Sequence, residues 1–146
     1  MFKRKRLIEV AHNENFVSYI DKSNNAIIFD CPYFPSSRSK SIEYIETIEK
    51  DFSNIVKLTK NCLNSRTVYY GSIFYYRTGE KVHDNDNTIL SHLINVMKHN
   101  RLISDDMAFS FTIINVADKN KIKKSRIIIL DKQKKPFEKK VCKLLS

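Results

Sequence analysis

Runs rich in Val, Ile, Phe and Tyr predict three short strands near the start of the chain, over residues 6–10, 15–20 and 26–30. The polar residues that separate these runs are typical of turns. Pro32 and Pro35 then interrupt extended structure. We therefore expect the first thirty residues to be strands joined by turns, followed by a loop.

Residues 41–63 show the apolar spacing of an amphipathic helix. Either Ser39 or Ser41 can cap its start. Apart from the adjacent Ile55 and Val56, the apolar positions follow one another at intervals of three or four, with one gap of seven: Ile42, Ile45, Ile48, Phe52, Ile55, Val56 and Leu63. Charged residues occupy the opposite side, so we expect the helix to pack on a core and to expose its polar side.

The second half of the chain predicts three strands and a helix. The strands cover residues 67–76, 107–116 and 125–130, and the helix covers residues 87–99. A turn is expected at residues 77–80. The four tyrosines of the first of these strands could stack on bases, but packing within a sheet is the commoner role.

Length and composition favour a single domain. The chain has 146 residues, of which 42% are hydrophobic and 29% charged, which excludes wholesale disorder. We expect an α+β fold with a small mixed or antiparallel sheet and two main helices. The longest aliphatic run, residues 127–130, is far too short to span a bilayer. Glu9 interrupts the apolar stretch that a signal peptide would need, so an intracellular protein is expected.

The net charge of +10 predicts a polyanionic partner, because lysine and arginine release condensed counterions from phosphates. An alternative is that part of the lysine excess is compositional drift of AT-rich coding DNA. Residues 131–146 form a basic segment, either a flexible tail or a short helix.

The cysteines and histidines do not predict a zinc site. Cys31, Cys62 and Cys142 are far apart, so reduced thiols are expected. His92 and His99 are seven residues apart and so lie on one helical face, yet no glutamate base or cysteine accompanies them at the spacing of a zinc site.

Two acidic pairs flank the predicted helix of residues 87–99 and are the main candidate chemistry. Asp84 and Asp86 precede it, and Asp105 and Asp106 follow it. We expect a short helix to return the chain beside its own entry point and so bring the pairs together. Converging carboxylates in a basic protein suit Mg²⁺ near a phosphodiester.

A structural role for these residues stays open. Asp86 or Asn87 is a good helix N-cap, and acidic residues favour the positive end of a helix dipole. Asp105 and Asp106 could be turn residues.

The pattern resembles the RusA-type Holliday-junction resolvases, which are small homodimeric endonucleases dependent on magnesium. The shared features are a strand, a basic loop, the motif Asp84-Asn85-Asp86-Asn87, a helix, and Asp105-Asp106 before the next strand. The resemblance covers residues 26–130. It leaves residues 1–25 as an N-terminal β extension and residues 131–146 as a basic tail.

The resemblance implies a function and a set of site residues. Asp84, Asp86 and Asp106 would be catalytic. The same three aspartates, together with the adjacent Asp105, would bind Mg²⁺, or Mn²⁺ as a substitute. The residues expected to contact nucleic acid are Arg77, Lys81, His83, Asn87, Lys98 and Arg101. A homodimer would nick branched DNA at two symmetry-related strands. Such a protein would be cytoplasmic, at nucleoid or viral DNA.

Two features depart from the family pattern. The spacing from Asp86 to Asp106 is about one residue longer than in the family. Leu90 stands where the family usually has a lysine that assists catalysis. Lys81, His83 or Lys98 could substitute for it. The alternative is a basic DNA-binding protein of the same fold without catalysis, and a third alternative is a small interaction protein without DNA affinity.

Overall fold

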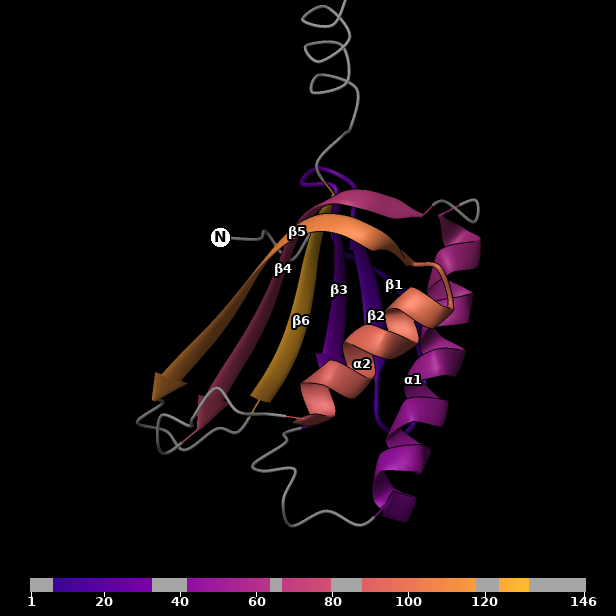
Figure 1. The fold of residues 1–146 in the computed structure, drawn as a ribbon, viewed down its shortest axis with the longest axis vertical. Helices are drawn as coiled ribbons and strands as arrows, with labels where there is room; N and C mark the ends of the chain where they lie inside the picture. The colour runs from indigo at the N-terminus through magenta and orange to yellow at the C-terminus, as the bar shows by residue number, and fades with distance from the viewer. Residues whose placement is uncertain (1–6, 33–41, 64–66, 80–87, 118–123, 132–146) are drawn as a thin grey trace, which may run out of the picture.

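A computed structural model describes residues 7–32, 42–63, 67–79, 88–117 and 124–131. Within them lie six strands and two helices (Figure 1). In chain order they are β1 (Leu7–His12), β2 (Val17–Asp21), β3 (Ala26–Cys31), α1 (Ile42–Cys62), β4 (Val68–Gly79), α2 (Thr88–His99), β5 (Ile103–Ala117) and β6 (Lys124–Asp131).

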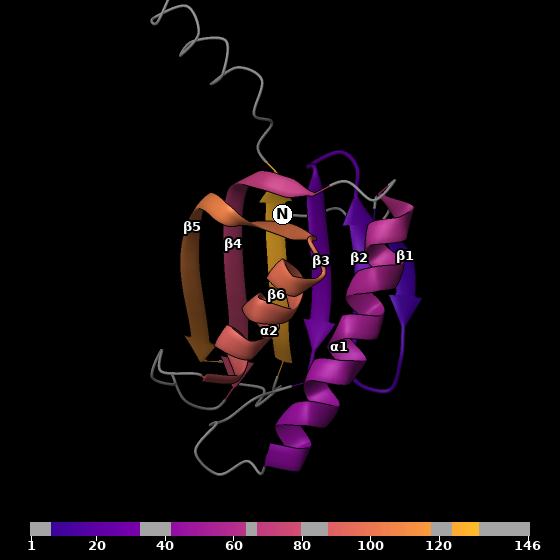
Figure 2. The ribbon, with the colours of Figure 1, turned by 45° about the vertical axis from the view of Figure 1, so that its right-hand side comes forward.

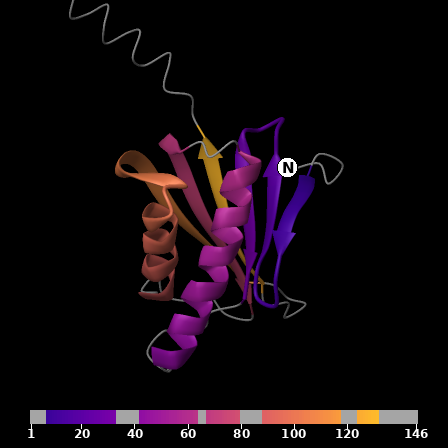
Figure 3. The same cartoon turned by 90° about the vertical axis from the view of Figure 1, so that its right-hand side faces the viewer.

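The six strands form one mixed sheet in the order β1-β2-β3-β6-β4-β5. Neighbouring strands are antiparallel except β4 and β5, which are parallel and joined through α2. Both helices lie on one face of this sheet, as the turned views in Figures 2 and 3 show. The expected α+β fold with a mixed sheet and two main helices is confirmed.

Phe52 of α1 connects the helix to the sheet. Its ring lies 4.9 Å from that of Phe16 and 5.0 Å from that of Phe29, and all three are fully buried. Phe16 comes from the segment expected to be an N-terminal extension, so that segment contributes to the same core as the rest of the sheet.

β4 is longer than the apolar pattern predicts. β4 continues to Gly79, so the turn expected at residues 77–80 is wrong for residues 77–79. Arg77 pairs with Asn115 on one side and with Ser125 on the other. Pairing on both sides satisfies the backbone of a central strand and outweighs the turn preference of a local sequence.

The end of α2 is a Schellman motif built on an arginine. The amide of Leu102 donates to the carbonyl of Met97 and that of Arg101 to Lys98, both at 3.0 Å. Arg101 takes the left-handed conformation that this motif requires, with φ of 58°. A Cβ atom makes that conformation unfavourable.

Replacing Arg101 with glycine is therefore expected to raise the free energy of unfolding, by about 0.5–1 kcal/mol. The side chain is exposed, so little packing is lost. Urea unfolding of both proteins measures the change. Arg101→Ala is the control and should give no gain, since alanine keeps the Cβ atom; an equal gain from both variants would contradict this account.

Candidate metal and nucleic-acid site

Four strands (β1, β3, β4 and β5) end and two (β2 and β6) begin at the same edge of the sheet, called the lower edge here (Figure 1). The register pairs Cys31 with Ser125 across β3 and β6, and Gly79 with Ala117 across β4 and β5. Both helices also begin at this edge. The segments that follow β3, β4 and β5 are therefore all attached there.

Five predicted site residues belong to the segment between Gly79 and Thr88, which lies outside the described residues: Lys81, His83, Asp84, Asp86 and Asn87. The two described residues that this segment joins, the last of β4 and the first of α2, are both at the lower edge.

Asp105 and Asp106 lie inside β5, because the strand begins at Ile103 and not after the acidic pair as predicted. Their backbone occupies an irregular stretch of the pairing with β4. Val68 pairs with Ile103 and Tyr70 with Ala108, so four residues of β5 oppose a single residue of β4. The regular ladder of hydrogen bonds between β4 and β5 is therefore interrupted at this point.

The parallel pairing of β4 and β5 changes the expected relation between the two acidic pairs. The chain was expected to come back, after the helix, beside the segment with Asp84 and Asp86. That expectation is wrong, because α2 leads instead to the end of the sheet where β4 begins. The helix has 12 residues and is about 18 Å long. Asp105 and Asp106 therefore lie in the part of β5 beside the beginning of β4, whereas the segment with Asp84 and Asp86 is attached to its end.

Arg77 was predicted to lie in a basic loop, but it lies in β4. It is 2% exposed, and its guanidinium lies 5.6 Å from the ring centroid of Tyr75, a cation–π distance. Ser125 Oγ donates a hydrogen bond to the Tyr75 hydroxyl at 2.7 Å. Arg77 is therefore part of a buried polar group just inside the lower edge, and its side chain does not reach solvent where a phosphate could bind.

Burial changes the acid–base behaviour of this group. It raises the pKa of Tyr75 to about 12, and it raises the pKa of the nearby Cys31 thiol strongly. Tyr75 thus has a structural role, and the expectation that it packs within the sheet is confirmed for this tyrosine. The side chains of Tyr69 and Tyr70 lie outside the described set.

The raised pKa of Tyr75 predicts a loss of stability at alkaline pH. An unfolded tyrosine ionises near pH 10, about two units below the folded pKa, so the unfolded chain releases its proton first. The free energy of unfolding should therefore fall between about pH 10 and 12, by about 1.4 kcal/mol per pH unit for this group. Tyr75→Phe should show a shallower decline in urea unfolding over that range. Parallel declines would contradict the prediction.

Lys98 and Arg101 lie at the end of α2 that is away from the lower edge. Arg101 is exposed and Lys98 is half-buried. Arg126, on the sheet face without helices, makes a two-pronged ion pair with Asp30, and this hydrogen bonding raises its pKa. Of the predicted phosphate-contacting residues that the structure describes, Lys98 and Arg101 are the ones that solvent reaches.

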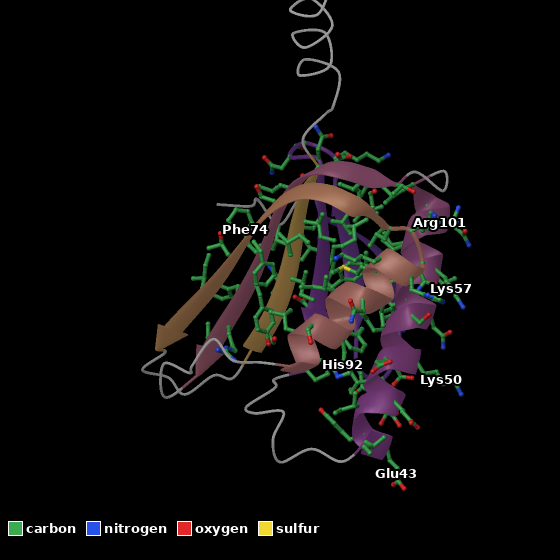
Figure 4. The ribbon with its side chains drawn as sticks, viewed as in Figure 1. Glu43, Lys50, Lys57, Phe74, His92 and Arg101 are labelled. Carbon is green, nitrogen blue, oxygen red and sulfur yellow. The ribbon has the colours of Figure 1, made fainter. Side chains whose placement is uncertain are left out.

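A cleft of about 530 Å³, lined mostly by polar and charged residues, lies between α1 and α2. The sequence patterns that predicted the two helices gave no indication of this cleft. His92 Nδ1 lies 2.9 Å from Glu49 Oε1 across this cleft. Figure 4 shows His92 on the side of α2 that faces α1. Both His92 and His99 line it, as their spacing on one helical face predicts. Within the described residues, no group of three or more His, Cys, Asp or Glu side chains is arranged to hold a metal ion.

The net positive charge of the chain lies outside the described residues. The described residues contain nine Lys and Arg against eleven Asp and Glu, whereas the remaining segments contain seventeen against five. The described part of the chain is thus slightly acidic, and most of the basic residues are in the segments attached to it.

No protein-family model matches the sequence, and no curated protein matches it. No helix in the described part of the chain is both long and apolar enough to cross a membrane. Among solved structures, a protein described as a "putative translation initiation inhibitor" from Salmonella typhimurium aligns with 87% of this chain and 97% of its own. The TM-score is 0.32 and the sequence identity 10%, which is too low to indicate a shared function.

Proposed function

We propose that this protein is a magnesium-dependent endonuclease that nicks branched DNA, with the four-way junction as its substrate. The observation that carries the proposal is the motif Asp84-Asn85-Asp86-Asn87, which joins the end of β4 to the start of α2 in a chain of net charge +10. Carboxylates concentrated in one short segment of a basic protein would repel a phosphate backbone unless a cation bound between them.

The donor set suits a hard cation. Asp84 and Asp86 supply carboxylate oxygens, and Mg²⁺ prefers oxygen ligands. When bound there, the metal would supply Lewis-acid polarisation of the phosphodiester and an activated water. Lys81 and His83, in the same segment, would hold the DNA backbone against the carboxylates. The resemblance assigns Asp106 to this site too. Because β5 is parallel to β4, Asp106 lies beside the beginning of β4 and not beside its end, so its role is tested separately.

The distribution of basic residues supports nucleic-acid binding. Residues 1–6 carry four basic residues and join β1 at Leu7, and residues 132–146 carry six and follow β6 at Asp131. Leu7 and Asp131, where these two segments join the sheet, lie at the ends of the strands opposite the lower edge. The register shows this, because Leu7 pairs with Asp21 and Ala26 with Leu130. Phosphate contacts from these segments would make the affinity fall steeply with salt.

Cleavage of a labelled four-way junction and of a linear duplex, with and without magnesium, tests the proposal. The wild type should nick the junction in pairs and only with metal. Asp86→Asn should lower the rate at least about 100-fold, or 2.7 kcal/mol in barrier height, while DNA binding is kept. Glu43→Gln, an exposed carboxylate on α1, is the control and should cleave normally. Equal loss of binding and cleavage in Asp86→Asn would contradict the proposal.

Asp106→Asn, in the same assay, decides whether the second acidic pair belongs to the site. A loss comparable to that of Asp86→Asn would place both carboxylates on one metal. Normal cleavage would restrict the metal ligands to the segment between β4 and α2.

Leu90 favours a second candidate, a DNA-binding protein without catalysis. Its side chain is 4% exposed and belongs to the core, so the position that the resolvases fill with a lysine is apolar and enclosed here. This candidate predicts junction binding that depends on salt but is indifferent to magnesium and to Asp86→Asn. Tight binding without cleavage in magnesium or manganese would establish it.

A further inference from the structure

The two edge strands of the sheet differ sharply in how well they are protected. β1 has six residues, a register shift between Glu9 and Ala11, and a contact between His12 and Glu9. Shortness, irregularity and charge are the features by which natural sheets prevent edge pairing. β5, at the other edge, has 15 residues, and among the described strands it pairs with β4 alone.

The second part of β5 has none of these protective features. Residues 107–117 contain no charged residue, no proline and no glycine. From Ala108 to Ala117 the pairing with β4 is regular. The backbone groups on the other side of the strand are therefore regularly spaced and can pair with a second strand. Phe111 is 42% exposed and Ile114 38% exposed, both high values for large apolar side chains in this protein.

We propose that two copies of this chain pair through the β5 edge, in an antiparallel two-fold arrangement centred on Thr112. Thr112 is the midpoint of residues 107–117, so this register pairs the whole uncharged stretch with itself. Each β5 then satisfies the outward backbone groups of the other, and the two sheets become one.

Charge favours a second copy as the occupant of this edge. Two copies of a chain with net charge +10 repel each other wherever their basic segments meet. An uncharged strand is the part of the surface where self-association brings no like charges together, and like charges directly opposite each other on paired strands are destabilising. The resemblance already implies a homodimer; what is proposed here is its interface, which is argued from β5 alone.

Sedimentation equilibrium of the full chain at micromolar concentration is the first test. The wild type should sediment at twice the monomer mass of 17.2 kDa. Thr112→Lys places two ammonium groups opposite each other and should weaken the dimer at least tenfold, or about 1.4 kcal/mol. Thr112 is exposed, so the folded monomer should tolerate lysine, as far-ultraviolet circular dichroism will show. The matched control is Ile8→Lys on β1, which is 51% exposed and should leave the dimer intact.

Cysteine cross-linking tests the register. Opposed residues in antiparallel strands have Cα atoms about 4.5–5.5 Å apart, within disulfide range. In a Cys62→Ser, Cys142→Ser background, Thr112→Cys should form a covalent dimer on oxidation and Ile8→Cys should not. A monomeric wild type would overturn the proposal, and it is the result expected if another protein, or another segment of this chain, covers β5. A dimer that Thr112→Lys does not weaken, or one cross-linked through Ile8→Cys, would overturn it as well.

Discussion

Replacing Phe52 with alanine is expected to lower the free energy of unfolding by about 3–5 kcal/mol. The phenylalanine is fully buried and contacts both Phe16 and Phe29, so it joins α1 to the β2–β3 side of the sheet. Truncation removes the apolar contacts of the ring and leaves a cavity between a helix and two strand segments, which the backbone of a sheet is too rigid to fill.

A domain of this size has a total stability of about 5–15 kcal/mol, so the Phe52→Ala variant should be partly unfolded at moderate temperature. Urea denaturation followed by circular dichroism measures the change. Leu58→Ala on the same helix is the matched control, because Leu58 is 51% exposed and should cost less than about 0.5 kcal/mol. Similar losses for the two variants would show that α1 does not pack on the sheet through Phe52.

Leu90→Lys is expected to destabilise the protein by several kcal/mol and not to increase cleavage. Leu90 lies in the first turns of α2 and packs in the same core as Leu93 and Met97. An ammonium group at this position would lose its hydration without gaining a described acidic partner in the core. The lysine found there in the resolvases therefore cannot be introduced at this point of the fold without cost.

Thermal unfolding and the junction assay, applied to the same preparation, test this second prediction. Asn95→Lys, at an exposed position of α2, is the control and should change the melting temperature little. A stable Leu90→Lys protein that cleaves faster than the wild type would contradict the prediction. It would also show that the lysine reaches a catalytic position.

Local periodicity predicted the helices well. The expected helices at residues 41–63 and 87–99 became α1 (Ile42–Cys62) and α2 (Thr88–His99). A helix is defined by hydrogen bonds and side-chain spacing within four residues, so its signal is present in a short window of sequence. All six strands were expected as well, but β4 ends three residues later than expected, and β5 begins four residues earlier and ends one later.

The candidate site was less predictable, because it depends on strand direction. An antiparallel β5 would have begun beside the end of β4, near the segment with Asp84 and Asp86. The parallel pairing instead places Asp105 and Asp106 beside the beginning of β4. No feature of residues 100–106 alone distinguishes these two outcomes, since both need only a helix followed by a strand. The burial of Arg77 was missed for a related reason: its neighbours Asn115 and Ser125 are far away in sequence.

The sequence by itself determined the α+β class, the positions of the elements and the concentration of basic residues, because these follow from local periodicity and composition. The tertiary structure decided which elements are neighbours. It made β5 a parallel edge strand, enclosed Arg77 and Leu90, and brought His92 to Glu49. Those outcomes come from hydrogen bonds and packing between residues distant in the chain, which no short window of sequence contains.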